Sequence, residues 1–362
     1  MDIAFRTIRL RKRVALAISR GVSGDSDNLF VSVTCGGVTG WGEMAPGVSQ
    51  GAATAQAGEA ALRAFCAELD ADGAAPPPLP GIMQIHDRAL RRRVPACALA
   101  ALDMALWDAR ARRARMPLYQ LLGIARPRAP TSITLGISPP ELVRERIPQL
   151  LGGGNGIRAL KVKLGSKHGI AADQAMFAAV LESVRCLGRA VSLRVDANGG
   201  WDVHEAQVMM KWLAGHGVEF VEQPLEAGRE ADLPALYKNR PLPIFVDESC
   251  RFADDIPVWA ESVDGVNLKL MKCGGITGAL RIIAVAGALR LKIMAGCMSE
   301  SSLSISAAAA LGGALDYIDL DSQLNLAPDP CRGAQLVDGI VTPPESPGHG
   351  AQIIVADPRH AE

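Results

Sequence analysis

Three acidic residues stand at matching places along the chain, each directly after a valine that ends a short apolar run. They are Asp196, Glu222 and Asp247, and neighbouring members are one strand-and-helix unit apart. A single acid at the end of a strand is commonly the cap of the next helix. Three acids at the ends of adjacent parallel strands would meet at one point, where they repel one another and take up protons unless a cation neutralises them. Ligation by carboxylate oxygens favours Mg²⁺ over zinc, so we predict that the three residues bind Mg²⁺.

Lysines flank these acids in the sequence. Lys161 and Lys163 lie in the apolar run before the first acid, and Lys269 lies in the run after the last one. A Lys-x-Lys pair is most often a solvated strand edge, but in a closed barrel the two-residue alternation of a strand points one set of side chains inward. A divalent cation or a second ammonium group lowers the pKa of such a lysine toward the working pH, so that the lysine can act as a base.

The two lysine-bearing runs are the second and the sixth of the series described below, so in a ring of eight strands they would lie opposite each other, with the metal-binding strands between them. A substrate carbon held beside the metal would then have one lysine on each face. Such an arrangement removes a proton from one side and returns a proton on the other. The expected chemistry is epimerisation or racemisation through a metal-stabilised enolate.

Asp319 and Asp321 form a second acidic feature, at the end of the last apolar run. An Asp-x-Asp pair is weak evidence by itself, because loops and helix caps contain many such pairs. Here the pair would lie across the ring from Glu222, where it would attract an ammonium group. A substrate with a carboxylate at the metal and a cation roughly 7 Å away, the span of two extended residues, matches a free dipeptide.

These residues need a frame of alternating strands and helices. From residue 131 onward, short apolar runs rich in branched side chains alternate with amphipathic stretches, which predicts parallel strands with helical crossovers. Eight such units in about 190 residues match a (β/α)8-type barrel, in which the chemistry lies at the carboxyl ends of the strands. The eight runs are residues 132–137, 159–164, 191–195, 218–221, 244–246, 266–270, 291–294 and 317–320.

The N-terminal third has the pattern of an α+β unit. Residues 30–41 indicate two paired strands around a Gly-Gly turn, residues 55–69 and 98–118 have helical spacing, and the proline-rich residues 74–80 indicate a loop. The chain as a whole is therefore predicted to be an α/β protein, a modified TIM barrel with an α+β capping domain. The predicted divisions are a capping domain at 1–125, a barrel at 126–325 and a C-terminal segment at 326–362 that returns to the capping domain.

Composition excludes several other classes of protein. Among 362 residues, 38 are Lys or Arg and 38 are Asp or Glu, and this balance gives no reason to expect nucleic acid or a membrane surface as a partner. Hydrophobic residues make up 49%, which argues against disorder, and no apolar run reaches the roughly 18 residues of a membrane-spanning helix. The eight cysteines are scattered without a C-x-x-C pair, which fits a reducing cytoplasm. We expect a cytoplasmic protein with a small-molecule substrate; the sequence leaves the oligomeric state open, and a homo-oligomer is compatible with it.

Taken together, the motifs resemble the enolase superfamily in its muconate-lactonizing subgroup, and within that subgroup the dipeptide epimerases, which include enzymes acting on Ala-Glu. The likeness covers essentially the whole chain. The barrel motifs are specific for the superfamily, whereas the Asp-x-Asp pair points to dipeptides. The matching stretches are Lys161-Val162-Lys163, Val195-Asp196-Ala197-Asn198, Val221-Glu222-Gln223-Pro224, Val246-Asp247-Glu248-Ser249, Asn267-Leu268-Lys269-Leu270-Met271-Lys272, Gly296-Cys297-Met298 and Asp319-Leu320-Asp321.

The resemblance also implies a role for each candidate residue. It implies that Mg²⁺ is the cofactor and that the acid/base catalysts are Lys163 and Lys269. It further implies that several residues contact the substrate and that one residue supports the metal ligands from behind. These are Lys161 for the substrate carboxylate, Asp319 and Asp321 for the dipeptide amino terminus, Thr134, Cys297 and Ser299 for the pocket wall, and Glu248 behind the metal ligands.

Two alternatives remain open. A cycloisomerase or an o-succinylbenzoate synthase would keep the metal ligands and the lysines, but neither substrate carries an ammonium group, so the Asp-x-Asp pair would be unfavourable there. The second alternative is a catalytically silent barrel that serves as a binding or structural protein. Such a barrel would bury five charged side chains and lose stability through their desolvation, with no catalytic role to explain them. We therefore expect Mg²⁺-dependent epimerisation of the C-terminal residue of a dipeptide.

Two loops of the capping domain, residues 19–28 and 44–51, resemble the loops that close over the barrel in this superfamily. Both contain Gly and Ser, as expected of mobile lids that exclude water. A substrate with a Glu side chain would need a cation close to it, but the first loop offers only Arg20 beside two aspartates, and Ser299 carries no charge. The sequence thus favours neutral or cationic side chains over acidic ones at the epimerised position.

Overall fold

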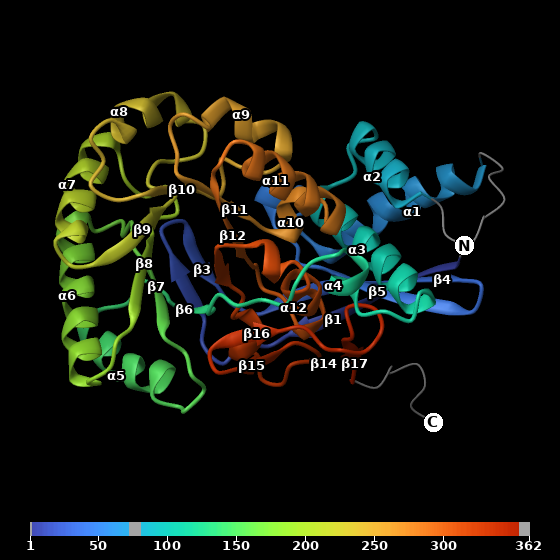
Figure 1. Ribbon diagram of the computed structural model, residues 1–362, viewed down its shortest axis with the longest axis horizontal. Helices are drawn as coiled ribbons and strands as arrows, with labels where there is room; N and C mark the ends of the chain where they lie inside the picture. The colour runs from blue at the N-terminus through green and yellow to red at the C-terminus, as the bar shows by residue number, and fades with distance from the viewer. Residues whose placement is uncertain (1, 72–80, 355–362) are drawn as a thin grey trace.

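The computed structural model describes residues 2–71 and 81–354, and its largest element is a parallel sheet of eight strands rolled into a near-barrel (Figure 1). The strands follow one another around the ring in chain order, and every predicted run forms one of them. The ring closes through a bridge between Thr131 and Ile318 and a 2.6 Å hydrogen bond from Ser132 Oγ to Asp319 Oδ1. The strands are β6 (Ser132–Leu135), β7 (Ala159–Lys163), β8 (Ser192–Asp196), β9 (Val218–Glu222), β10 (Ile244–Val246), β11 (Gly265–Leu268), β12 (Lys292–Gly296) and β13 (Tyr317–Asp319).

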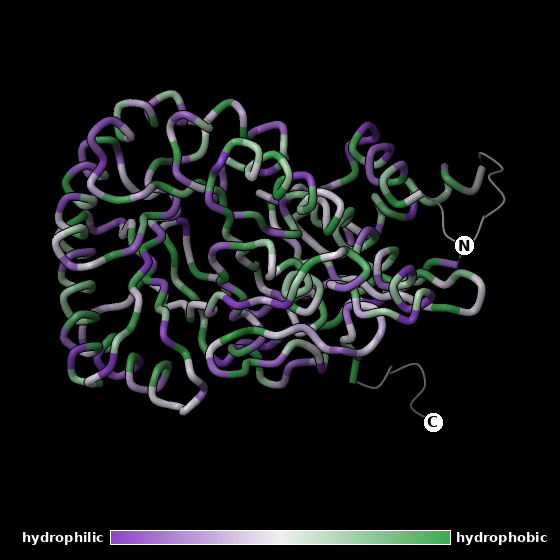
Figure 2. The backbone as a smooth tube through the Cα atoms, viewed as in Figure 1, coloured by the Kyte–Doolittle hydropathy of each residue, from purple (hydrophilic) through white to green (hydrophobic). Residues whose placement is uncertain are grey.

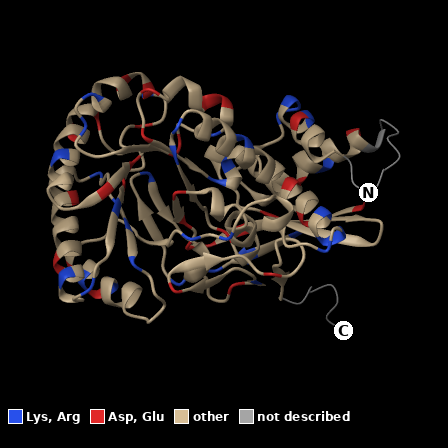
Figure 3. Ribbon diagram, in the orientation of Figure 1, with Lys and Arg blue, Asp and Glu red and all other residues tan. Residues whose placement is uncertain are grey.

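Helices connect successive strands and cover the outside of the ring (Figure 1). Their outer faces carry charged residues of both signs, which Figure 3 shows scattered over the surface without a face of one sign. After β13 the described chain continues into a short 3₁₀ helix, Ser322–Asn325, in place of an α-helix. The helices are α5 (Pro140–Leu151), α6 (Ile170–Cys186), α7 (Val203–Ala214), α8 (Leu233–Tyr237), α9 (Ile256–Trp259), α10 (Leu270–Cys273), α11 (Ile276–Ala288) and α12 (Ser302–Ala309).

The inside of the ring is filled by layers of side chains, because alternate residues of each strand point inward. Phe220, Phe245, Met294 and Tyr317 pack together in one layer inside the ring, below the carboxyl ends of the strands. A Cβ atom at Gly265 would lie 2.3 Å from the Phe245 ring, so only glycine fits beside this layer. Two residues further along the same strands stand the polar side chains of the candidate site.

The N-terminal part is an antiparallel sheet in the order β1-β4-β5, packed against helices. The predicted strand pair and its turn are confirmed, with Cys35 opposite Val38. Cβ atoms at Gly40 and Gly42 would lie 2.1 and 1.9 Å from carbonyl oxygens of α3, which explains glycine at these two contacts. The elements are β1 (Asp2–Leu10), β2 (Leu16–Ile18), β3 (Gly21–Ser23), β4 (Ser26–Cys35), β5 (Val38–Met44), α1 (Ala55–Ala71), α2 (Ile82–Arg91), α3 (Ala96–Arg113) and α4 (Leu118–Leu121).

Both predicted helical stretches of this part are helices in the structure, as α1 and as α3 with α4. Helix α2 was not foreseen from the sequence pattern. The loop predicted at residues 74–80 lies outside the described residues. In Figure 2, hydrophobic and hydrophilic residues alternate along the helices, as expected where one face packs inward. Among the described residues, no helix is long and apolar enough to cross a membrane.

The C-terminal segment contacts both other parts of the chain. His349 N donates to Asp108 Oδ1 of α3 (2.9 Å), and Thr131 N, just before β6, donates to Gly339 O (2.9 Å). The segment therefore contacts the N-terminal part and the barrel alike, and the predicted domain boundaries stay a prediction. Its strands are β14 (Cys331–Arg332), β15 (Gln335–Val337), β16 (Ile340–Thr342) and β17 (Gln352–Ile353).

Candidate active site

A cavity of about 550 Å³ opens at the carboxyl ends of the barrel strands, and the β2–β3 hairpin forms part of its wall. The hairpin is fastened to the barrel, because Ser19 Oγ and Arg20 Nη1 both donate to the Asn198 carbonyl, at 2.9 and 3.0 Å. The second predicted lid loop also reaches the cavity, through Ser49 and Gln50. Both loops therefore lie where they were predicted to lie, and their mobility stays a prediction.

Asp196, Glu222 and Asp247 come together at this end of the barrel. They stand at the last residues of β8 and β9 and directly after β10, one strand apart. All three are buried, and a carboxylate oxygen of each lies within 4.8 Å of an oxygen of the other two. The structure thus brings together the three acids that the sequence selected, and their role as metal ligands stays a prediction.

The surroundings of these acids fit a small divalent cation. Burial and the neighbouring Asp196 raise the pKa of Glu222 to about 7, as expected for carboxylates crowded in a dry site. Asn267 Nδ2 donates to Glu222 Oε1 (2.6 Å), and Asn198 Nδ2 donates to Asp196 Oδ2 (3.2 Å). The amide oxygens of both asparagines are buried and have no hydrogen-bond partner among the described residues. Oxygen donors and spare acceptors in one place suit Mg²⁺.

Two lysines approach the acids from opposite sides of the ring. Lys163 on β7 donates to Asp196 Oδ2 (2.5 Å), and Lys269, directly after β11, donates to Asp247 Oδ2 (2.6 Å). Three strands, β8 to β10, lie between the strands that carry them. Both side chains are almost fully buried yet line the cavity. Their amines are therefore placed to reach two faces of one bound molecule.

The neighbouring carboxylates shift the pKa of Lys269. Burial alone would lower it, but the Asp247 and Glu222 carboxylates outweigh burial and raise it above its usual value. The lowered pKa expected from the sequence assumes a divalent cation bound by these same acids, which would neutralise their charge, so it stays a prediction. In the structure the carboxylates are the nearest charges, and they stabilise the protonated lysine.

Lys161 lies deeper than expected. Its side chain is 2% exposed, and its amine contacts Asp319, Glu222 (3.4 Å) and Asp196 (3.8 Å). Burial is outweighed by these carboxylates, led by Asp319, so the pKa of Lys161 is well above its usual value. Lys161 thus connects Asp319 at the end of β13 to the central acids, and it also faces the cavity where a substrate carboxylate was expected to bind.

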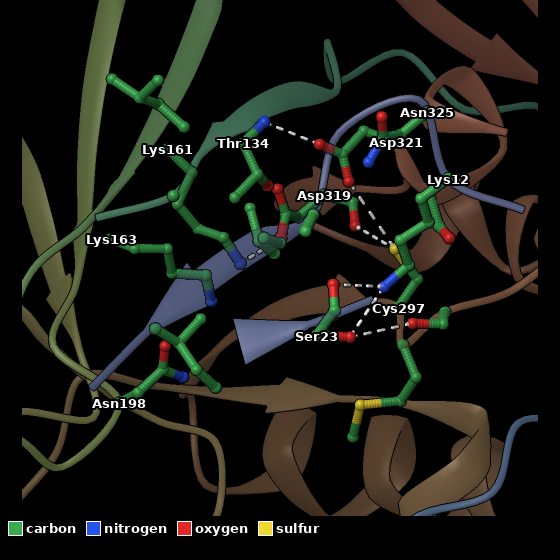
Figure 4. A pocket seen from close by; sticks show the side chains of 18 of the residues that line it. Lys12, Ser23, Thr134, Lys161, Lys163, Asn198, Cys297, Asp319, Asp321 and Asn325 are labelled. Carbon is green, nitrogen blue, oxygen red and sulfur yellow. Dashed lines mark hydrogen bonds and ion pairs between the residues drawn. The ribbon is translucent and has the colours of Figure 1, made fainter. Parts of the chain in front are cut away.

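The two aspartates at the end of β13 have different partners, although the sequence treats them alike (Figure 4). Asp319 is held by Lys161 and by Ser132 Oγ. Asp321 Oδ2 accepts a hydrogen bond from the Thr134 amide (2.6 Å), and the Thr134 side chain also hydrogen-bonds to this carboxylate. Among the described residues, Asp321 Oδ1 has the Cys297 thiol at 3.8 Å. Burial, with the nearby Asp319 charge, raises the pKa of Asp321 to about 6. Asp321 is therefore the acid of this pair that has an oxygen to spare for a ligand.

The remaining predicted residues also lie at the cavity. Thr134 contributes its backbone amide, and Cys297 lies against the two aspartates. Ser299 Oγ is 3.4 Å from Ser23 Oγ of the hairpin. Glu248 Oε1 accepts from Arg20 Nη2 (2.5 Å) and from the Asn198 amide (3.3 Å), behind the central acids as expected.

Sequence reasoning missed several residues of the cavity wall. Lys12, whose amine donates to Ser23 Oγ (2.7 Å), and Asn325 line the cavity without having been candidates (Figure 4). No sequence signal connects residue 12 to a site more than a hundred residues away. Asn267 could have been found, because it lies two residues before Lys269 and therefore points to the same side of its strand.

Comparison with known proteins places the chain in a family. Residues 3–123 match the mandelate racemase / muconate lactonizing enzyme N-terminal domain, and residues 150–357 match the enolase C-terminal domain-like family. The chain therefore belongs to the mandelate racemase / muconate lactonizing enzyme family of enolase-like proteins. This agrees with the resemblance and the fold expected from the sequence.

Individual relatives are similar over nearly their whole length. A hydrophobic dipeptide epimerase from a Flavobacteria bacterium is 55% identical, covering 98% of both chains. A hydrophobic dipeptide epimerase from Roseobacter litoralis is 57% identical, covering 97% of this chain and 98% of that one. The crystal structure of a dipeptide epimerase from Enterococcus faecalis, complexed with Mg and L-Leu-L-Tyr, has a TM-score of 0.87 at 31% identity, covering 96% of this chain and 98% of that one.

Proposed function

We propose that this protein is a Mg²⁺-dependent epimerase of dipeptides with hydrophobic side chains, and that it inverts the Cα of the C-terminal residue. The observation that carries the proposal is the placement of Lys163 and Lys269 on opposite sides of three buried carboxylates. The names of the relatives support the same activity. The apolar wall of the cavity supports the preference for hydrophobic side chains. That wall includes Val14, Leu16, Ile133, Leu135, Met298 and Leu324.

In the proposed reaction, one lysine first takes the proton from Cα, which leaves a carbanion stabilised by the adjacent carboxylate group. The lysine across the ring then donates a proton to the other face. Asp196, Glu222 and Asp247 would hold Mg²⁺, which when bound supplies positive charge beside the substrate carboxylate and neutralises the three acids. Roles of the lysines exchange for the reverse reaction, so one site serves both epimers. The hairpin over the cavity excludes water from the exposed carbanion.

Asp321 is the proposed acceptor for the substrate ammonium group. Asp321 lines the cavity, and among the described residues its Oδ1 has the Cys297 thiol at 3.8 Å, whereas Asp319 is engaged by Lys161. We assign the ammonium contact mainly to Asp321, and to Asp319 the holding of Lys161. Neither a cycloisomerase nor an o-succinylbenzoate synthase would use such an acceptor.

Deuterium uptake from D₂O provides the direct test of the activity. A library of L,L-dipeptides incubated with the enzyme and Mg²⁺ is expected to gain one mass unit per epimerised molecule, with hydrophobic dipeptides leading. Chiral chromatography of the products identifies the inverted residue. Lack of exchange for every dipeptide, together with turnover of a muconate or a succinylbenzoate precursor, would refute the proposal.

Removal of the Asp321 charge is expected to weaken dipeptide binding. Asp321→Asn should raise KM by roughly 10- to 100-fold, because a hydrogen bond to a charged group contributes about 1.5 to 3 kcal/mol. In the wild type, KM should also rise as the pH falls below about 6, where Asp321 takes up a proton. N-acetyl dipeptides, which lack the ammonium group, should be poor substrates. Equal kcat/KM for acetylated and free dipeptides would exclude an ammonium site at Asp321.

Arg20 is expected to hold the β2–β3 hairpin against the barrel and to have no part in selecting the side chain of the substrate. It is already engaged by Glu248 and by the Asn198 carbonyl. Because its side chain is half exposed, its ion pair contributes only about 0 to 1 kcal/mol. Arg20→Ala should therefore lower kcat/KM for L-Ala-L-Leu, L-Ala-L-Lys and L-Ala-L-Glu alike, by less than roughly tenfold. A lead for the Glu dipeptide that disappears in Arg20→Ala would contradict this.

A further inference from the structure

Lys272 is a fourth lysine at the site, and the proposed reaction gives it no part. It lies in α10, three residues after Lys269, and its side chain is 4% exposed. Its amine donates to Asp247 Oδ1 (2.5 Å) and to the Asp247 carbonyl. It also donates to the carbonyls of Cys250 (3.0 Å) and Asn267 (2.9 Å). An ammonium group has three N–H bonds, so these oxygens occupy all of its donors.

Lys272 and Lys269 divide the Asp247 carboxylate between them. Lys269 holds Oδ2 and Lys272 holds Oδ1. The partnership of Lys269 with Asp247 cannot be permanent if Lys269 exchanges a proton with substrate. Lys272 has no donor left for a substrate, so its contact with Asp247 is available throughout the reaction.

The backbone contacts of Lys272 extend its influence to a second acid. Cys250 belongs to the turn after β10, and Asn267 belongs to β11. The Asn267 side chain in turn donates to Glu222 Oε1 (2.6 Å). One buried ammonium group therefore connects the end of β10, the strand beside it and the short helix that begins next to Lys269.

We propose that Lys272 is a positioning residue, which orients Asp247 for metal binding and holds Lys269 at a constant place relative to it. The inference rests on the proposed function, but its test does not require turnover. If Lys272 contributed only its charge, its removal would strengthen Mg²⁺ binding, because one cation less would repel the metal. If it orients the ligand, its removal weakens Mg²⁺ binding. The direction of the change in affinity decides between the two.

Mg²⁺ binding to the purified full-length chain is measured by titration calorimetry for Lys272→Met, Lys269→Met and the wild type. We expect Lys272→Met to bind Mg²⁺ about 10- to 100-fold more weakly, the range found when groups behind metal ligands are lost. Lys269→Met, which removes the other ammonium group from the same carboxylate, should bind Mg²⁺ as well as the wild type or better. Lys292→Met removes an exposed ion pair with Asp316 outside the site and is the matched control.

Kinetics add a second readout. In Lys272→Met, kcat should fall by a larger factor than KM rises, because Lys272 touches no substrate.

Wild-type or stronger Mg²⁺ affinity in folded Lys272→Met would overturn the proposal. If circular dichroism shows that this variant is unfolded, Lys272→Arg is titrated instead, since it keeps the charge but cannot place one nitrogen among the same oxygens. Wild-type affinity in Lys272→Arg would likewise overturn it. Failure of the wild type to epimerise dipeptides would refute the proposed function and leave this comparison intact.

Discussion

Lys163→Met and Lys269→Met are each expected to lower kcat for epimerisation by at least about 10³-fold, because in the proposed reaction each removes the acid/base group that serves one face of the substrate. The remaining lysine can still act on its own face. Each variant should therefore exchange the Cα proton of one epimer with D₂O while leaving the other epimer unlabelled, and the two variants should show opposite preferences. Mass spectrometry of separated L,L and L,D dipeptides measures both effects.

The control for these variants is Lys292→Met, whose lysine lies at the opposite ends of the strands and pairs with Asp316 on the surface. It should epimerise at the wild-type rate. Wild-type epimerisation by either Lys163→Met or Lys269→Met would remove that lysine from the mechanism. Exchange of the same epimer in both variants would show that the lysines share one face, against the opposite placement on β7 and β11.

Substitution of a central acid is expected to abolish activity through loss of the metal. Asp196→Asn and Glu222→Gln each remove one negative charge from a buried site whose oxygen atoms lie within 4.8 Å of one another. Neutral amides bind Mg²⁺ more weakly than carboxylates, so activity should fall by at least roughly 10³-fold and excess Mg²⁺ should restore little of it. Calorimetric titration with Mg²⁺ should show the loss independently of turnover.

Exposed acids near the strand ends provide matched controls. Glu226→Gln and Asp254→Asn make the same chemical changes on the surface and should leave activity and Mg²⁺ affinity unchanged. In the wild type, exhaustive chelation should stop turnover, and added Mg²⁺ should restore it. Full activity after chelation would exclude a metal-dependent reaction.

The parts of the site that could be predicted from the sequence depend on local periodicity. Side chains alternate along a strand, so Lys161 and Lys163 had to share a face wherever their strand was placed. Asp196, Glu222 and Asp247 follow apolar runs at the spacing of a strand-and-helix unit, so parallel pairing had to bring them together. The eight runs and the family resemblance follow from the same pattern.

Other features depend on contacts between residues far apart in the chain, and no local pattern contains them. The sequence presents Asp319 and Asp321 as an equivalent pair. In the structure, Asp319 contacts the Lys161 amine and the Ser132 hydroxyl. Asp321 lines the cavity, and its Oδ1 lies 3.8 Å from the Cys297 thiol. The carboxylates around Lys161 and Lys269 likewise raise the pKa of these two lysines, and only the tertiary structure brings those carboxylates close.

The sequence by itself determined the class of barrel, the three acids and the two opposed lysines, because strand periodicity and strand-end spacing are properties of short segments. Only the tertiary structure decided that Lys12 forms part of the cavity wall, and that Lys272 and Lys269 each hold one oxygen of the Asp247 carboxylate. The free energies of these contacts depend on burial and on the distances between charges. Both arise only when the ring closes and the N-terminal strands pack against its mouth.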